Sequence, residues 1–215
     1  MASDNLRPGL PNRSRSASTG SARNEWRQGG RHVTVLAMFL QVLIAVALAA
    51  TAPLQSSLQP ADDFNRLTAD QLRAGIEQRH PVAYYVLAGK LFEAGVRDEA
   101  VFWFYSGQLR YRFHLAANPK LSPSGDPALF ASLSDVLGQR INEYAFGDLT
   151  QLLATIDKVL DWDESTDNGF TSKTAHSAAW KDVRGGLVKM RDFVESNGEQ
   201  IRAQRKQNGL ENRKP

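Results

Sequence analysis

The stretch from residue 83 to residue 114 constrains the fold most strongly, because it joins a helical apolar repeat to a glycine break. Its first apolar residues recur at three- and four-residue spacing, which is typical of one buried helix face: Tyr84, Leu87, Ala88 and Leu91. Gly95 then supplies the left-handed residue that commonly ends a helix. Residues 100–105 are apolar on all sides, so we expect other parts of the protein to enclose them. The stretch predicts two helices joined by a tight turn, which form the core nucleus.

The same stretch carries an ordered set of aromatic and small residues: Tyr84, Leu87 and Ala88, then Ala100, Phe104 and Gly107. In this order it resembles a single tetratricopeptide or Sel1-type helical hairpin. The chain departs from that pattern at Leu91, where an aromatic is usual, and at Arg112, where the repeat often ends in Pro. No second copy follows about 34 residues on. The resemblance covers residues 83–114 and implies helix-on-helix packing and a protein-binding surface, but no chemistry.

The first 52 residues divide into a basic segment and an apolar one. Residues 1–32 are rich in Ser, Asn, Gly and Arg, and we expect them to be disordered. Residues 33–52 are apolar, and two interpretations of them stay open. They form either the centre of a signal peptide cleaved near Ala49 or a membrane anchor of about 20 residues. In both cases the basic flank stays in the cytoplasm and the rest of the chain crosses the membrane.

The charge of the chain is concentrated in that leader. The formal net charge is +3 and the pI is near 9.3. Residues 1–52 hold six of the 26 basic side chains and two of the 23 acidic ones, so the remainder is close to neutral. The basic pI therefore does not indicate that the rest of the chain binds nucleic acid. The chain has no Cys, which excludes disulfides and thiol nucleophiles.

Apolar periodicity beyond the hairpin predicts further helices and no strand. We expect an all-α domain of about six helices in residues 67–207, after a linker at 53–66 and before a disordered tail at 208–215. Capping residues should open two of these helices, at Thr68 and Asp148. Gly138 should interrupt a third helix that starts at Pro127. The outer helices are expected at 68–79, 127–138, 148–162 and from residue 177 onward, with residues 198–215 polar and frayed.

No catalytic or metal signature appears in the sequence. His80, His114 and His176 are spread over three segments without the spacing of a metal site, so we predict neither a metal nor a cofactor. Residues 161–172 resemble the start of a calcium loop but lack the Gly and the bidentate Glu that such a loop requires. A looser calcium site in that loop remains an alternative.

Polar residues that interrupt the aromatic second helix of the hairpin are the candidate binding residues. We predict a groove that contacts an anion or a peptide, formed by Tyr105, Gln108, Tyr111 and Arg112. The alternative for the arginines of this helix is a structural ion pair, because buried charges are normally paired. The expected acidic partner is Glu143 or Asp148.

These features favour an exported, non-enzymatic helical module that binds another protein. It would be periplasmic or anchored in the inner membrane, as an immunity-type inhibitor or an assembly factor of the bacterial envelope. Its partners would be a protein and, if residues 33–52 are retained, the membrane, but no nucleic acid. The alternative is an envelope-polymer hydrolase with a site assembled from scattered residues: His114, Arg112, Glu143 and Asp148. That alternative requires these side chains to line one concave pocket.

Overall fold

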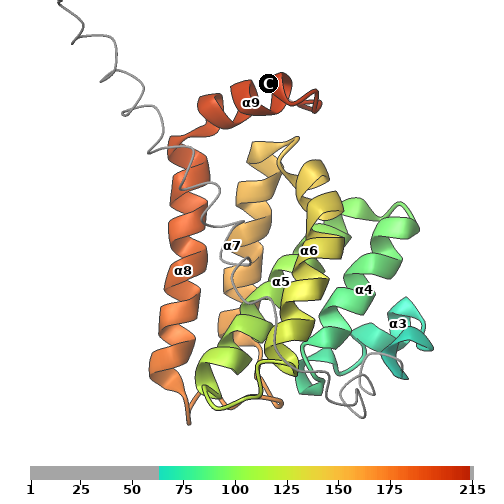
Figure 1. Cartoon of the computed structure of the whole chain (residues 1–215), viewed down its shortest axis with the longest axis vertical. Coiled ribbons are helices and arrows are strands. Elements are labelled where there is room, and N and C mark those ends of the chain that lie inside the picture. Colours follow the sequence, from blue (N-terminus) through green and yellow to red (C-terminus); the bar gives the residue numbers. More distant parts are fainter. Residues whose placement is uncertain (1–62, 214–215) are drawn as a thin grey trace, which may run out of the picture. The chain divides into compact units, whose positions relative to one another are not determined.

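A computed structural model describes residues 63–213, which lie in the compact unit Thr51–Pro215. These residues contain helices and no strand, which confirms the predicted all-α class (Figure 1). The elements are α3 (Ala69–Arg73), the 3₁₀ helix η2 (Ile76–Gln78), α4 (Val82–Glu93), α5 (Arg97–Ala117), α6 (Asp126–Ala145), α7 (Leu149–Ser165), α8 (Ser177–Ser196) and α9 (Gly198–Gln207). The predicted leader segments, 1–32 and 33–52, lie outside the described residues. Within residues 63–213, no helix is long and apolar enough to cross a membrane.

The helices α4 and α5 pack along each other, and α5 also carries α6, α7 and α8 (Figure 1). The turn between α4 and α5 is closed by Gly95, whose φ of +81° is the predicted left-handed conformation. The two helices approach closely at Gly107, where an added Cβ would lie 2.8 Å from the Tyr84 Cβ. This close approach explains why a glycine stands in the middle of a long helix, where it otherwise costs stability.

Side chains of α5 are buried on most sides of the helix, as the apolar run predicted. Phe104 and Tyr105 are buried, and Tyr85 of α4 belongs to the same cluster, whereas Tyr84 packs against Trp103 of α5. The ring of Phe104 lies edge-on to Tyr85, with centroids 5.6 Å apart. Trp103 is only half-buried. The stretch around the hairpin is therefore the core to which the outer helices add their apolar faces.

The predicted helix caps are confirmed. The side chain of Thr68 accepts a hydrogen bond from Gln71 N at the start of α3 and forms a complete capping box. Asp148 accepts from Gln151 N at the start of α7, at 3.0 Å. Both caps depend only on local sequence, because the capping oxygen and the free N–H group lie three residues apart.

Several predicted boundaries are wrong. The first outer helix does not continue to residue 79, because Gly75 adopts a φ of +69° and separates α3 from η2. Gly138 does not interrupt α6; its Cβ position lies 3.2 Å from the Phe104 ring, so it makes room for the core. The helix α7 extends past residue 162 to Ser165, and residues 198–207 form α9 where a frayed segment was expected.

Candidate functional site

The structure brings together only part of the predicted binding set. Tyr105 and Tyr111 are 4% and 0% exposed, and their hydroxyls donate inside the protein, to Asn142 and to Asp126. Arg112 is exposed and donates through Nε to the half-buried Gln108, at 3.2 Å. Gln108 and Arg112 are therefore the two members of the set that a partner could reach.

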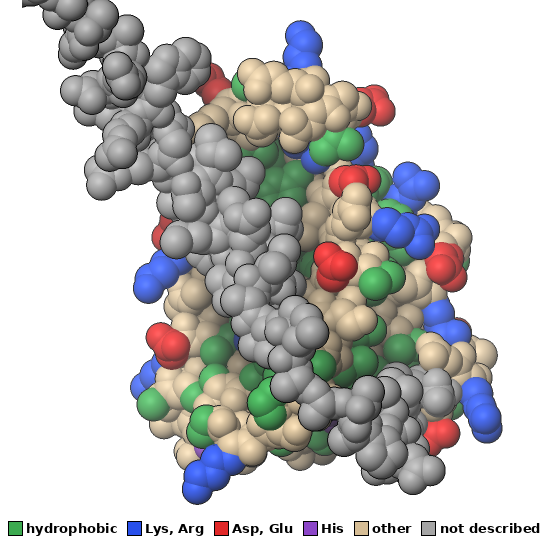
Figure 2. Space-filling view, viewed as in Figure 1, with side chains coloured by type: hydrophobic (Ala, Val, Ile, Leu, Met, Phe, Trp, Pro, Cys, Tyr) green, Lys and Arg blue, Asp and Glu red, His purple; other side chains and the backbone are tan. Residues whose placement is uncertain are grey.

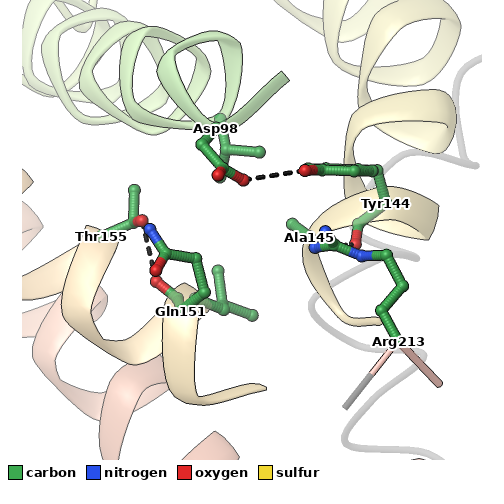
Figure 3. Close-up of a pocket in the computed structure, with 8 residues that line it drawn as sticks. Asp98, Tyr144, Ala145, Gln151, Thr155 and Arg213 are labelled. Carbon is green, nitrogen blue, oxygen red and sulfur yellow. Dashed lines mark hydrogen bonds between the residues drawn. The ribbon is translucent and has the colours of Figure 1, made fainter. Parts of the chain in front are cut away.

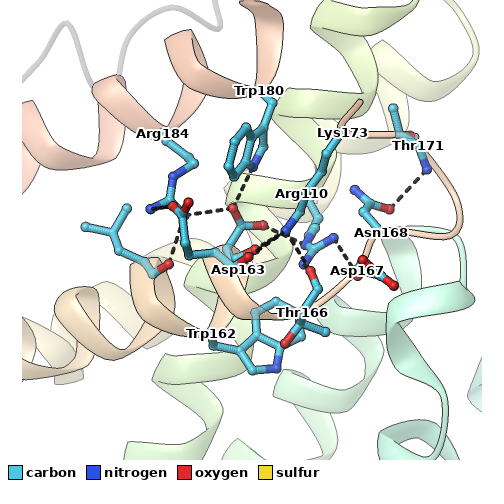
Figure 4. A network of polar contacts seen from close by, with 12 residues as sticks. Arg110, Trp162, Asp163, Thr166, Asp167, Asn168, Thr171, Lys173, Trp180 and Arg184 are labelled. Carbon is cyan, nitrogen blue, oxygen red and sulfur yellow. Dashed lines mark hydrogen bonds and ion pairs between the residues drawn. The ribbon is translucent and has the colours of Figure 1, made fainter. Parts of the chain in front are cut away.

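The predicted ion pair exists on α5, but its acidic member is a different residue from the expected Glu143 or Asp148. Arg110 Nε lies 2.9 Å from Asp163 Oδ1 of α7, and both side chains are 1% exposed. Arg184 and Trp180 of α8 contact the second oxygen of this carboxylate, at 2.9 and 2.8 Å (Figure 4). Glu143 and Asp148 are not the partners. Because a buried charge is stable only when it is paired and hydrogen-bonded, this network ties α5, α7 and α8 together.

Cations also stabilise the end of α7. Lys173 donates to the backbone carbonyls of Asp163 and Thr166, and Arg110 donates to those of Thr166 and Asp167 (Figure 4). These contacts satisfy carbonyls that a helix end leaves free. Residues 161–165 lie in α7 and not in a loop. Both oxygens of the Asp163 carboxylate form ion pairs with arginines, Arg110 and Arg184. The alternative of a loose calcium site therefore loses its central ligand.

The four residues of the hydrolase alternative do not line one pocket. His114 contacts Asp126 at the start of α6, whereas Glu143 lies near the end of the same helix. Asp126 and Glu143 are therefore about 25 Å apart along α6, at about 1.5 Å per residue. Asp148 is buried as the cap of α7, and Arg112 is exposed. The structure therefore does not assemble that site.

A small cavity lies near the end of α6 (Figure 3). Tyr144 donates to Asp98 at 2.9 Å, and the guanidinium of Arg213 stacks on the Tyr144 ring, 3.6 Å from its centroid. The cavity volume is about 10 Å³, which is about enough for one water molecule. It is too small for a substrate, and its contacts hold the chain near Arg213 against α6.

A second polar cluster, the His80–His114–Asp126 cluster, joins three helices at one end. His80 Nε2 lies 3.2 Å from Asp126 Oδ1, and His114 Nε2 lies 2.9 Å from Asp126 Oδ2. Tyr111 donates to Asp126 Oδ1 at 3.1 Å. His80 precedes α4, His114 belongs to the last turns of α5, and Asp126 begins α6. The cluster is partly open, since the three side chains are 12%, 11% and 23% exposed.

The hydrogen bonds define the protonation of this cluster. Both Nε2 atoms face a carboxylate, which only accepts, so each carries a proton. Val82 N donates to His80 Nδ1 at 3.2 Å, which makes His80 a neutral imidazole. Burial lowers the pKa of His80, although the charge of Asp126 opposes the effect. Burial also raises the pKa of Tyr111, so its hydroxyl remains a donor.

Asp126 is the anion of the cluster. Burial opposes its ionisation, but the hydrogen bond from His114 and the contacts with His80 and Tyr111 together outweigh burial. The pKa of Asp126 is therefore below its usual range. Phe170, 39% exposed, lies beside both imidazoles, with centroids 4.7 and 5.0 Å away. The result is an ionised carboxylate held between two histidines under an aromatic side chain.

The helix α8 presents a third feature, which we name the α8 stripe. Its members follow each other at alternating four- and three-residue spacing and all are half-buried: Ala179, Val183, Gly186, Met190 and Phe193. Among the residues of α8, Val194 is the one that is fully buried. The row of Arg184 and Arg191 contacts α7 instead, and lies about 130° around the helix from the stripe.

Sequence reasoning missed the histidine cluster and the acidic partner of Arg110 for the same reason. Asp126 is the first residue of α6, and His80 lies just before α4, so each has a local role at a helix boundary. Their contact with His114 depends on how α4, α5 and α6 pack. The presence of two histidines next to helix ends was the available signal, but nothing local indicated that they face one carboxylate.

Comparisons with known proteins give a limited result. No protein-family model matches the chain, and no solved structure matches it. An uncharacterized protein of Haemophilus influenzae is 31% identical over 84 residues, which is 38% of this chain. The match spans 32% of that protein, so the chain covers about a third of the length of this relative. The relative's description names no activity, substrate or partner.

Proposed function

We propose that the protein is an exported, non-enzymatic helical module that binds another protein through the α8 stripe. The observation that carries this proposal is the incomplete burial of α8. Val183, Met190 and Phe193 pack against the edge of the core, but all three are only half-buried, so part of this apolar face remains accessible. Its spacing is that of a helix that packs against a second helix. We therefore infer that the partner offers an amphipathic helix.

The surroundings of the stripe support a close helix contact. An added Cβ at Gly186 would meet nothing within 4 Å, so the backbone of α8 is open to approach at this point. In Figure 2, Lys and Arg side chains lie mostly toward the outline of the molecule, with hydrophobic side chains between the helices where grey atoms do not cover them.

Export and the repeat-like hairpin are parts of the same proposal. Export rests on the basic residues 1–32 and the apolar residues 33–52 that follow them. The packing of α4 on α5 supports the resemblance to a tetratricopeptide or Sel1-type hairpin, whose relatives bind proteins. An immunity-type inhibitor or an envelope assembly factor would both fit. The hydrolase alternative is not favoured, since its four residues lie apart.

Site-directed photo-crosslinking in native cells tests the proposal. A benzophenone amino acid replaces Met190 in the stripe, and a matched variant carries it at the neighbouring exposed Lys189. We expect a crosslinked partner band at position 190 that is weaker or absent at position 189. Gly186→Glu should remove the band without lowering the melting temperature, because space is open there.

Three outcomes would contradict the proposal. Equal bands at both positions would show that the contact is not specific to the stripe. A band at the mass of two chains would make the occupant a second copy. A band that survives Gly186→Glu would move the interface away from α8.

A further inference from the structure

We propose that His80, His114 and Asp126 form a binding site for a zinc ion. The inference goes beyond the protein-binding proposal and does not depend on it. One ligand atom from each of the three side chains lies within 4.8 Å of the other two. His80 precedes α4, His114 lies in α5 and Asp126 begins α6, so the arrangement is made by the tertiary fold and not by a local motif.

The geometry requires only a small closure around an ion. Zinc binds imidazole nitrogen and carboxylate oxygen at about 2.0–2.2 Å, so two of its ligand atoms in a tetrahedral site lie about 3.4 Å apart. A spread of 4.8 Å must therefore close by about 1.4 Å. All three side chains are partly exposed, at 12%, 11% and 23%, and rotations of the two imidazoles and the carboxylate toward one another would supply that movement.

The chemistry of the donor set selects the metal. Two imidazole nitrogens with one carboxylate oxygen suit zinc, whereas magnesium and calcium prefer sites built from oxygen alone. Three protein ligands leave a fourth position for water, as in open zinc sites. The partial exposure of the cluster gives the ion and this water a path from solvent.

Contacts around the cluster can orient the ligands once a metal is bound. With zinc on Nε2, the proton of each neutral imidazole resides on Nδ1. His114 Nδ1 lies 3.2 Å from Thr171 Oγ1, which can accept that proton's hydrogen bond. Tyr111 donates to Asp126 and holds the carboxylate in place. Such outer contacts are the usual support of a metal-binding histidine.

Zinc binding has two identifiable costs. Asn118 Nδ2 now donates to His114 Nδ1 at 3.2 Å, and a proton on that Nδ1 would end the bond. His80 Nδ1 now accepts a hydrogen bond from Val82 N at the start of α4, and a proton on Nδ1 would end that bond. The Val82 amide must therefore change its environment when zinc binds. This gives a residue-specific signal that a nonspecific surface metal would not produce.

The experiment is calorimetric titration of the tag-free, purified full chain with zinc sulfate at pH 7.5. We expect one zinc per chain, a rise in melting temperature, and a shift of the Val82 amide resonance. His80→Gln, Asp126→Asn and His114→Gln should each weaken binding by more than about 100-fold, since even outer-contact changes cost about 10–100-fold. His176→Gln is the matched control and should bind as the wild type does.

Circular dichroism of each variant separates loss of zinc from loss of fold. His80→Gln is the variant least dependent on core packing, because His80 lies before α4 and not within the apolar core. Failure of the wild type to bind zinc, or equal loss in His176→Gln, would overturn the site. The cluster would then be a hydrogen-bonded tie between three helices.

Discussion

The close approach of α4 and α5 makes one glycine indispensable, and a second glycine in the same protein provides its control. Gly107 lies in α5, where an added Cβ would be 2.8 Å from the Tyr84 Cβ and 3.2 Å from the Tyr85 ring. Gly185 lies in α8, where the added atom would meet nothing within 4 Å. Replacement by alanine is the same chemical change at both sites, but the two proteins should respond in opposite directions.

The magnitudes follow from two effects. Alanine in place of a helical glycine contributes about 1 kcal/mol of stability. Overpacking a core typically costs about 1–3 kcal/mol, and the upper end applies to Gly107 because a Cβ cannot move without its backbone. Gly107→Ala should therefore lose about 2 kcal/mol, while Gly185→Ala should gain about 1 kcal/mol. For a domain of this size each kcal/mol shifts the melting temperature by about 2–4 °C.

The assay is urea unfolding and thermal melting of each purified full chain. The free energy of unfolding from the urea midpoint should decrease for Gly107→Ala and increase for Gly185→Ala relative to the wild type. A Gly107→Ala protein as stable as the wild type would refute the close contact of the two helices. A destabilised Gly185→Ala protein would show that the outer face of α8 is already covered.

Three further predictions concern the core and its charges. Arg110→Met should cost about 3 kcal/mol in urea unfolding, because it leaves the buried Asp163 with fewer partners; a cost below about 1 kcal/mol would contradict the buried pair. Phe104→Ala should cost about 3–5 kcal/mol by the same assay, and an unchanged melting temperature would place that ring outside the core. Hydrogen bonding to Arg73 lowers the pKa of Glu99. The stability that ionised Glu99 contributes is therefore fully present above the ordinary glutamate pKa of about 4.3. It is lost as the pH falls through the lowered pKa. The melting-temperature difference between the wild type and Glu99→Gln should therefore close in acid, and a difference independent of pH would contradict the ion pair.

Local features of the sequence predicted much of the fold. The spacing of apolar residues located α4 and α5, and Gly95 marked the turn between them because a positive φ is a local requirement. The caps at Thr68 and Asp148 followed from the same kind of reasoning. Each of these depends on residues a few positions apart, which a sequence displays directly.

Features that depend on packing could not be predicted in this way. Gly138 has the local appearance of a helix break, but the ring of Phe104 from another helix is what requires it. The partner of Arg110 is 53 positions away, at Asp163. The contact of His114 with Asp126 depends on where α6 begins against α5. In each case the partner is chosen by the tertiary arrangement, which apolar spacing does not specify.

The absence of cysteine from the chain allows a direct measurement of whether the α8 stripe is covered in the cell. Single cysteines replace Met190 in the stripe and Asp161 on the exposed side of α7, and a small maleimide that does not cross the inner membrane labels intact cells and purified protein. We expect position 161 to react in both samples, and position 190 to react in purified protein but to be protected in cells. Equal reactivity of the two positions in cells would contradict partner binding through the stripe. Protection of position 190 in purified protein would assign the cover to the chain itself, and no labelling of either position in cells would contradict export.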